Sequence, residues 1–553
     1  MSSDDTSYTY SPFVCKVGNH KIFIEGRIPS PSLVEVATKM TDFADDWTWI
    51  GDWASRRALL TPSREAFYDY TSDTRYTFEQ LNSRASQLAN VLSANGIKKG
   101  DRVATYSKNR MEMVDLFLAT GKVGAIMVPF NVRLAAPETS YLLHKTKPKV
   151  LLLDPEVSQQ FEEPRKNLQN CKVFSMGSNE SFDPSITNIM DEARDSVEVR
   201  PTLDFSDPHL IVFTGGTTGL PKGAVLSHRL IFWNSVNTIT SWGLRPDDVQ
   251  PLLFPLFHTG GWNVLLVPFL HLGAKTILMG DFDAAEILQV IQREKCSIVI
   301  GVPTMFQMMA QHDTFQTTSF DSVRVFISGG APCPVAIMEN YWARGKYFKM
   351  GYGLTEVGPN NFYLPESLIK RKPSSVGFPV LHCDTRVVDD DNKPVSLGKA
   401  GELLLRGPHA FSGYWEEPEE TAKTIEADGW VHTGDLVVVD DEGFYFIVGR
   451  KKDMFISGGE NVFPTEIEEV LYKHPSILEA AVIGVPDEKW GEVGKAVVSL
   501  KKGASLTPEE IHKYLDGKLA RYKIPKYYEI RDSLPKSAAG KILKRELEKD
   551  VKS

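Results

Sequence analysis

One stretch of the chain reads Phe213-Thr-Gly-Gly-Thr-Thr-Gly-Leu-Pro-Lys-Gly223. It follows the apolar run 210–213, which has the length and composition of a buried strand. Glycines let backbone N–H groups approach an anion, threonine hydroxyls add donors, and Lys222 adds positive charge. Ligands of open α/β sheets bind at the carboxyl ends of strands, so this loop predicts a phosphate site at a sheet edge. Gly223 follows the lysine, whereas the P-loop pattern has serine or threonine there.

The elements around this loop alternate in type. A capping box at Thr77 begins a helix whose apolar residues, Leu81, Ala85, Leu88 and Leu92, share one face. Strand and helix patterns then alternate, which predicts a parallel sheet covered by helices. The expected strands are 103–106, 125–129, 150–153, 297–300 and 323–327, and the expected helices are 111–120 and 137–143. Residues 155–205 are more polar and predict a surface excursion.

The pattern of predicted strands and helices changes in the last third of the chain. Residues 385–448 contain strand patterns separated by Asp/Gly turns, which predicts a β-rich subdomain. Helices at 464–472 and 508–519 and strands at 480–485 and 495–500 follow, and they predict a separate small α+β domain.

Composition narrows the class of protein. The 553 residues include 62 Lys plus Arg against 71 Asp plus Glu, a net charge of -9, which argues against a general nucleic-acid binder. The five cysteines are scattered without a CxxC pair, which favours a reducing compartment and a cytoplasmic protein. The acidic N-terminus lacks the features of a secretory signal. The longest nearly apolar run, 264–270, is too short to span a membrane.

Six further segments carry polar residues in glycine-rich surroundings. Taken alone, each is typical of a turn, a cap or a solvated face. They are Phe254-Pro-Leu-Phe-His-Thr-Gly-Gly-Trp262, Ser328-Gly-Gly-Ala-Pro332, Gly351-Tyr-Gly-Leu-Thr-Glu-Val-Gly358, Gly429-Trp-Val-His-Thr-Gly-Asp435 with Gly449-Arg450, Ile456-Ser-Gly-Gly-Glu-Asn-Val462, and Pro535-Lys-Ser-Ala-Ala-Gly-Lys541.

In this order and spacing, the segments resemble those of the adenylate-forming superfamily, which includes acyl-CoA synthetases, luciferases and amino-acid adenylation domains. The resemblance runs from about residue 47 to residue 544. It implies an α/β fold with a large AMP-binding N-terminal domain of layered sheets, residues 47–451, which includes the β-rich subdomain. A small mobile C-terminal α+β domain, residues 452–553, would be hinged at Lys452. Residues 1–46 are an extension outside the resemblance.

The resemblance also implies a nucleotide site. The phosphate loop would supply Thr214, Gly215, Gly216, Thr217, Thr218, Gly219 and Lys222, although the family usually has a hydroxyl residue where this chain has Gly215. Gly330 and Ala331 would border the adenine and Tyr352 would stack on it. Thr355 would contact the α-phosphate, and Glu356 with Thr214 would hold Mg²⁺. Asp435 would bind the ribose, Arg450 the ribose or a phosphate, and Lys541 would act in catalysis as a cation beside the reacting groups.

Fewer motifs indicate where the carboxylic acid and the thiol of coenzyme A would bind. By resemblance, His258 is a catalytic gate beside the acyl carbon, and Phe257, Trp262 and Met350 line an apolar pocket. No acidic residue occurs between 251 and 280, which argues against an amino-acid substrate. The stretch Lys349-Met350-Gly351 lacks the tryptophan that restricts acetate-specific relatives. Gly458 and Gly459 would border the tunnel for coenzyme A.

These features predict an AMP-forming acyl-CoA synthetase that uses ATP, Mg²⁺ and coenzyme A and acts on a fatty or other hydrophobic acid. Four alternatives share the motifs: a ligase for aryl or short substituted acids, a fatty acyl-AMP ligase that loads a carrier protein, a luciferase-like oxygenase, and an inactive adenylate-binding regulator. The regulator should have lost Lys541, Glu356 or Asp435, and all three are present. A homodimer is a further possibility for such an enzyme.

Overall fold

The computed structural model describes residues 48–177, 183–197, 200–214, 221–537 and 540–552, together with the backbone of strands β1 (Phe13–Val17) and β2 (His20–Ile24). The chain divides into two compact units, Met1–Thr48 and Trp49–Ser553. In the first unit β1 and β2 pair antiparallel, with Phe13 opposite Ile24. Among the described residues, no helix is long and apolar enough to span a bilayer.

A six-stranded sheet carries the loop at residue 213. Its four strands β6, β5, β7 and β8 are parallel, and β9 and β10 form an antiparallel hairpin at one edge. The order is β10 (Lys222–Ser227), β9 (Pro208–Thr214), β6 (Ile126–Phe130), β5 (Arg102–Tyr106), β7 (Val150–Leu153) and β8 (Lys172–Ser175). The predicted strand 210–213 is therefore confirmed as part of β9.

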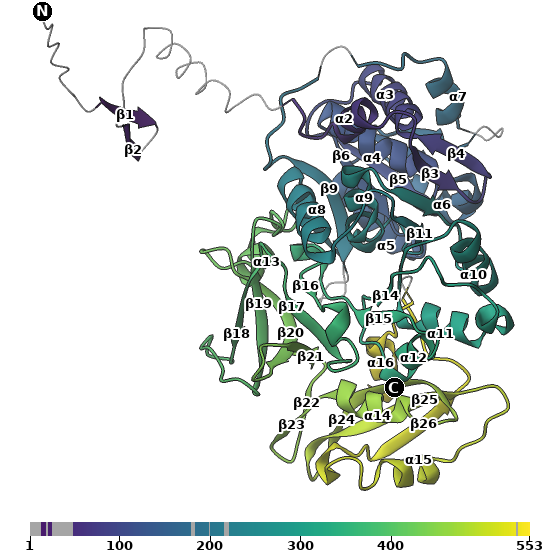
Figure 1. Ribbon diagram of the computed structural model, residues 1–553, viewed down its shortest axis with the longest axis vertical. Helices are drawn as coiled ribbons and strands as arrows, with labels where there is room; N and C mark the ends of the chain where they lie inside the picture. The colour runs from purple at the N-terminus through teal and green to yellow at the C-terminus, as the bar shows by residue number, and fades with distance from the viewer. Residues whose placement is uncertain are drawn as a thin grey trace, which may run out of the picture. The chain divides into compact units, whose positions relative to one another are not determined.

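Helices cover this sheet as the alternating pattern predicts (Figure 1). They include α2 (Trp53–Leu60), α3 (Phe78–Ala94), α4 (Met111–Val123) and α5 (Ala136–Thr146). The capping box at the start of α3 is confirmed, because Thr77 and Gln80 exchange side-chain and backbone hydrogen bonds. The four residues expected on its apolar face are almost fully buried.

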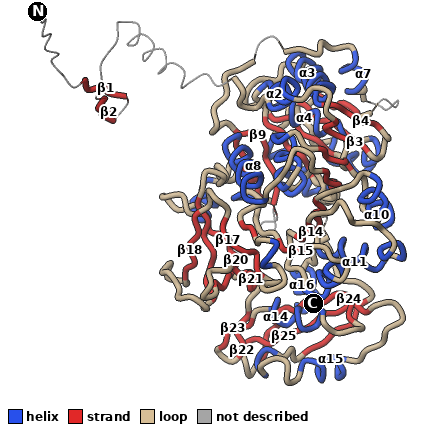
Figure 2. Tube along the Cα trace, viewed as in Figure 1, coloured by secondary structure: helices blue, strands red, loops and turns tan. Residues whose placement is uncertain are grey.

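A seven-stranded sheet lies next in the same unit, and Figure 2 shows helices packed on it. All neighbouring strands are parallel except β3 and β4. The order is β15 (Tyr347–Met350), β14 (Val325–Ser328), β13 (Ile298–Gly301), β11 (Val249–Leu252), β12 (Lys275–Leu278), β3 (Glu65–Asp69) and β4 (Thr74–Thr77). The helices of this region are α8 (His228–Trp242), α9 (Leu266–Leu272), α10 (Ala284–Arg293), α11 (Pro303–Gln311) and α12 (Val335–Trp342). One core joins the two sheets, since it contains Met127 of β6 and Val299 of β13.

The β-rich part is an antiparallel six-stranded sheet. Its order is β16 (Phe362–Tyr363), β17 (Ser375–Pro379), β21 (Tyr445–Arg450), β20 (Val431–Val439), β19 (Ala400–Arg406) and β18 (Asp384–Val388), and helix α13 (Pro418–Thr424) follows β19. The sheet begins at Phe362, before residue 385. The sequence shows no alternation there because β16 has only two residues and β17 contains glycine and proline.

A last five-stranded sheet contains β22 (Phe455–Ser457), β23 (Glu460–Val462), β24 (Ile477–Asp487), β25 (Gly491–Leu500) and β26 (Tyr527–Arg531). Helices α14 (Pro464–Tyr472) and α15 (Pro508–Leu515) pack on one face, where Ile467 and Ile511 join Val482. Helix α16 (Lys544–Lys552) covers the other face, where Leu547 joins Val497.

The surface excursion expected at 155–205 is only partly correct. The segment contains α6 (Ser158–Arg165), the sheet strand β8 and α7 (Ile186–Asp191). Ile186 and Met190 of α7 are almost fully buried in the main core. The apolar pattern is weak because β8 is an edge strand with only two buried residues, and α7 is less than two turns long.

Candidate active site

The candidate site begins at the carboxyl ends of β14 and β15. The chain leaves β15 at Met350 and turns back on itself, so that the amide N–H of Asn361 donates to the carbonyl of Tyr352 at 3.0 Å. Gly358 permits this turn because its φ is +71°, a conformation that glycine adopts readily. The phenol of Tyr352 donates to Oδ2 of Asp435 at 2.7 Å. Two segments that lie far apart in sequence therefore meet here.

Asp435 has a second partner on its own sheet. It lies directly opposite Arg450 in the β20–β21 pair, and Nε of Arg450 is 3.0 Å from Oδ1. Asp435 is 6% exposed, whereas the side chain of Arg450 is 43% exposed. A nearly buried carboxylate between two donors is well suited to bind hydroxyl groups of a ligand that displaces one of them.

Glu356 is held in the short 3-10 turn Thr355–Val357 that follows Tyr352. Its Oε1 accepts a hydrogen bond from the phenol of Tyr414 at 2.8 Å, and its carbonyl accepts one from the amide of Phe411 at 2.7 Å. Burial raises the pKa of Glu356, and the bond from Tyr414 opposes that rise. Thr355 precedes it in the same turn and is half-buried.

The end of β9 lies close to this turn. Lys222 on β10 is opposite Thr214 on β9, and its ammonium group lies 5.4 Å from the centroid of the Tyr414 ring. The same ammonium forms an ion pair with Glu420 of α13. The remaining predicted phosphate-loop residues, Gly215, Gly216, Thr217, Thr218 and Gly219, lie outside the described residues.

The donor set suits Mg²⁺, which prefers hard oxygen ligands and keeps several waters. Glu356 offers a nearly buried carboxylate beside Tyr414, and Thr214 offers a hydroxyl on the strand paired with Lys222. The hydroxyl of Thr214 lies 3.5 Å from the carbonyl of Lys222. Thr214 and Glu356 remain predictions as metal ligands, and their oxygen chemistry fits the ion.

Lys541 is carried by a turn of the C-terminal segment. Its backbone N–H donates to the hydroxyl of Ser537 at 3.1 Å. Gly540 precedes it with a φ of +77°, and the carbonyl of Gly540 accepts a hydrogen bond from Thr304 of α11 at 3.4 Å. Burial, aided by the charge of Arg450 and opposed by that of Asp435, lowers the pKa of Lys541 to about 8. The ammonium group therefore lies in the field of the Asp435–Arg450 pair.

Gly330 and Ala331 follow β14, the neighbour of β15. Gly330 has a φ of +78°, and a Cβ atom on it would stand 3.8 Å from Val302 at the end of β13. Both residues thus lie at the same sheet edge as Tyr352, where the adenine wall is predicted.

His258 follows β11 and precedes a single turn of π-helix, Gly260–Val264. Its Nε2 is buried and has no hydrogen-bond partner among the described residues. Burial, aided by the charge of Arg133, lowers its pKa to about 4, so the imidazole is neutral near pH 7. Phe257 packs beside it with ring centroids 5.0 Å apart. A π-helical turn is frequent at functional sites.

The other two predicted pocket residues differ in position. Met350 ends β15 and its sulfur accepts a hydrogen bond from the amide of Cys333 at 3.4 Å. Trp262 is fully buried, donates from its indole to the carbonyl of Leu256 at 2.5 Å, and stacks on Phe117 at 4.9 Å. Its contacts are those of a core residue, because its polar atom and the face against Phe117 are occupied.

Gly458 and Gly459 form the tip of the β22–β23 hairpin, with φ of +60° and +88°. A Cβ atom on Gly458 would stand 3.0 Å from the ring of Trp490. The tip contacts Trp490, whereas the Lys541 turn contacts α11, so these two predicted sites have different neighbours. Lys452 is exposed. It lies in a turn in which the backbone N–H of Asp453 donates to the carbonyl of Arg450.

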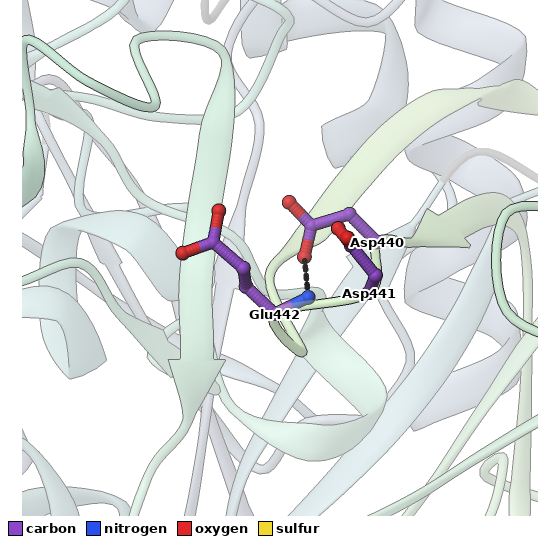
Figure 3. Close-up of side chains that lie close together, drawn as sticks. All are labelled: Asp440, Asp441 and Glu442. Atoms are coloured by element: carbon purple, nitrogen blue, oxygen red, sulfur yellow. Dashed lines mark hydrogen bonds between the residues drawn. The ribbon is translucent and has the colours of Figure 1, made fainter.

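An acidic turn between β20 and β21 lies outside this site (Figure 3). Asp440, Asp441 and Glu442 place oxygen atoms near one another. Asp440 accepts from the amide of Glu442 at 3.1 Å, and Lys372 lies 2.5 Å from Asp440 and 2.7 Å from Glu442. The hydrogen bond stabilises the turn, and the two ion pairs hold it to Lys372.

Comparison with known proteins identifies the chain. Residues 54–415 match the family model described as AMP-binding enzyme, and residues 466–541 match the AMP-binding enzyme C-terminal domain. The chain belongs to the AMP-binding enzyme family. Feruloyl-CoA synthase of an Amycolatopsis species is 37% identical over 498 residues, which cover 90% of this chain and 98% of that protein. Long-chain-fatty-acid–CoA ligase FadD13 of Mycobacterium tuberculosis is 34% identical over 500 residues, which cover 90% and 97%.

A solved relative of the AMP-binding enzyme supports the fold. ATP-bound MatB from Rhodopseudomonas palustris has a TM-score of 0.84 and 31% identity, and the match covers 91% of this chain and 99% of that one. The chain is an AMP-forming CoA ligase, with ATP and coenzyme A as co-substrates. Its α/β fold, with a large N-terminal part and a smaller C-terminal part, agrees with the predicted class.

Sequence reasoning missed Tyr414, Glu420 and Thr304. Tyr414 bonds Glu356 across 58 residues of chain, and Thr304 contacts Gly540 across 236. Contacts of that separation leave no local signal.

Proposed function

We propose that this AMP-binding enzyme converts a hydrophobic carboxylic acid, either fatty or aromatic, into its CoA thioester through an acyl-adenylate. One observation carries the proposal. Tyr352 and Arg450 both contact Asp435, and the charges of Asp435 and Arg450 act on Lys541. An aromatic face, a carboxylate and two cations in one place match the adenine, the ribose and the phosphates of a nucleotide.

In the proposed first step, an oxygen of the acid attacks the α-phosphorus of ATP and pyrophosphate leaves. Tyr352 holds the adenine, Asp435 accepts from the ribose hydroxyls, and Thr355 donates to the α-phosphate. Lys541 stabilises negative charge that develops on the phosphate, and burial strengthens that interaction. Bound Mg²⁺, held by Glu356 and Thr214, would neutralise phosphate charge. The carboxylate is already ionised near pH 7, so no general base is needed.

In the proposed second step, the thiol of coenzyme A attacks the acyl carbon and AMP leaves. The C-terminal domain turns about Lys452, which withdraws Lys541 and brings Gly458 and Gly459 to the thiol tunnel. The exposed turn at Lys452 supports this proposal, because a hinge needs a few residues whose backbone angles can change.

The proposed acid class rests on the segment around His258. Neutral His258 lies beside Phe257, and no acidic residue occurs between 251 and 280 to hold an amino group. The feruloyl-CoA synthase and the fatty-acid ligase that resemble this chain are named for an aromatic and an aliphatic acid, so both classes belong in the proposal.

The test is AMP release with and without coenzyme A, measured on acids from acetate to long fatty acids and on cinnamate-type acids. We expect AMP and thioester in equal amounts, only with hydrophobic acids, and only with coenzyme A present. Accumulation of acyl-adenylate without coenzyme A use would instead identify a ligase that loads a carrier protein. Absence of pyrophosphate release with every acid would refute the proposed chemistry.

A further inference from the structure

A line of hydrogen bonds, buried apart from its exposed outer member His382, runs through α8 to the turn that carries Tyr352 and Glu356. Nδ1 of His382 lies 2.6 Å from Oδ1 of Asn237, and Nδ2 of Asn237 lies 3.5 Å from Nδ1 of His409. Nε2 of His409 lies 2.8 Å from Oδ1 of Asn361. Nδ2 of Asn361 donates to the carbonyl of Gly358 at 2.7 Å. These four side chains thus form a connection to one backbone turn. It starts from α8 and from the loop between β19 and α13, which carries His409.

The direction of these bonds is fixed by their last member. A carbonyl only accepts, so the amide nitrogen of Asn361 must face Gly358 and its oxygen must face His409. His409 therefore carries its proton on Nε2, and its Nδ1 accepts from Asn237. The oxygen of Asn237 then accepts from His382. Every link in the line has one donor and one acceptor.

Burial makes the line rigid. Asn237 and Asn361 are 0% exposed, and His409 is 1% exposed. A buried polar atom without a partner is costly, so each member holds the next in one orientation. Burial lowers the pKa of His409 to about 4, which keeps the imidazole in the neutral form that the line requires. Gly407 makes room for the ring, because a Cβ atom there would stand 2.4 Å from it.

Asn361 closes both ends of the turn. Its backbone N–H donates to the carbonyl of Tyr352, and its side chain donates to the carbonyl of Gly358. Glu356 lies between these two anchor points. A side chain that orients Asn361 therefore helps to hold the backbone from which the side chains of Tyr352 and Glu356 extend.

We propose that His409 is a positioning residue for adenylation. It acts through Asn361 and holds the Tyr352–Gly358 turn in the geometry that binds Mg-ATP. The inference rests on the proposed roles of Tyr352 and Glu356. His409 itself does not contact the nucleotide in this proposal.

The decisive comparison is between two amide substitutions that differ by one methylene group. In His409→Gln the amide nitrogen reaches the place of Nε2 and still donates to Asn361, whereas in His409→Asn it does not reach. We expect H409N to raise the KM for ATP about tenfold in pyrophosphate release, and H409Q to stay within about threefold of wild type, since the bond to the buried Asn361 is lost only in H409N. The KM for the acid should change less than that for ATP.

Two controls separate positioning from general damage. His271 is another histidine that burial keeps neutral, and it bonds Ser235 away from the turn, so His271→Asn should leave the KM for ATP unchanged. In a Glu356→Gln background the H409N effect should shrink, because the residue through which it acts has already been altered.

The outcomes are distinct. Equal KM values for ATP in H409N and H409Q, or full additivity with E356Q, would overturn the role of His409. If E356Q alone left pyrophosphate release unchanged, the proposed function of the turn would fail as well. If E356Q lowered it and H409N did not, only the inference about His409 would fail.

Discussion

Arg450 and Asp435 face each other across β21 and β20, with 3.0 Å between Nε and Oδ1, while the other oxygen of Asp435 accepts from Tyr352. The Arg450 contact comes from the β-rich sheet, and the Tyr352 contact comes from the end of β15 in the seven-stranded sheet. Both oxygens of one nearly buried carboxylate are therefore engaged. Each oxygen can still accept a further hydrogen bond, so ribose hydroxyl groups can bind Asp435 beside these donors or in place of one of them.

Replacing Asp435 with Ala should weaken ATP binding. The variant loses an acceptor for the ribose hydroxyls, and charged hydrogen bonds contribute about 1.5–3 kcal/mol, so we expect the Kd for ATP to rise roughly 10- to 100-fold. Equilibrium binding of ATP without acid measures the change. Asp384→Ala, which removes an exposed partner of Arg406 on the same sheet, is the matched control. An unchanged Kd in D435A would remove the ribose assignment.

Replacing Lys541 with Ala should separate the two half-reactions. Pyrophosphate release should fall at least 100-fold, because loss of one preorganised donor at a developing charge typically costs about 10²–10³ in rate. Thioester formation from supplied acyl-adenylate and coenzyme A should remain near wild type. Lys549→Ala, an exposed lysine paired with Glu546, should change neither. Equal loss of both half-reactions in K541A would contradict the role given to Lys541.

The pH dependence of adenylation should reflect Lys541. Its pKa is lowered to about 8, so the cation is fully present below that pH and is lost above it. Adenylation should therefore be nearly flat from pH 6 to 7 and decline through pH 8, approaching tenfold per unit well above it. Rapid-quench pyrophosphate release across this range gives the profile. Lys541→Arg keeps its charge throughout, so whatever activity it retains should lack the decline; the same decline in K541R would assign it to another group.

Stability should depend on pH through Lys349. This lysine is 2% exposed, donates to the carbonyl of Leu364 at 3.1 Å, and has its pKa lowered by burial to about 7. Between that pKa and the usual value of 10.5, the unfolded chain binds more protons than the folded one, so this group makes stability rise with pH. The slope is at most about 1.4 kcal/mol per pH unit.

Lys349→Met should remove that slope while it keeps most of the buried volume. Urea unfolding of the wild type and the variant at pH 7.5, 8.5 and 9.5 measures the difference. Lys346→Met is the control, because this half-buried lysine precedes β15 and likewise donates to a backbone carbonyl, that of Val323 at 3.3 Å. A slope that persists unchanged in K349M would show that Lys349 stays charged in the folded protein.

Elements with strong local signals were predictable from sequence. The capping box of α3, strand β7 at 150–153 and helix α14 at 464–472 agree with their expected positions. Helix α15 ends at Leu515 instead of 519, since Asp516 and Gly517 break it. Strand β8 was missed because an edge strand needs few buried residues and so leaves little pattern.

The sequence by itself determined the residue types at each turn, the strand that leads into the phosphate loop, and the order of motifs that places the chain in its family. Only the tertiary structure decided that Tyr352 meets Asp435, that Tyr414 bonds Glu356, and that His409 orients Asn361. Glycine turns and apolar periodicity are local properties of the chain. A buried hydrogen bond instead depends on two segments that packing brings together, and its partners are fixed only when the core has formed.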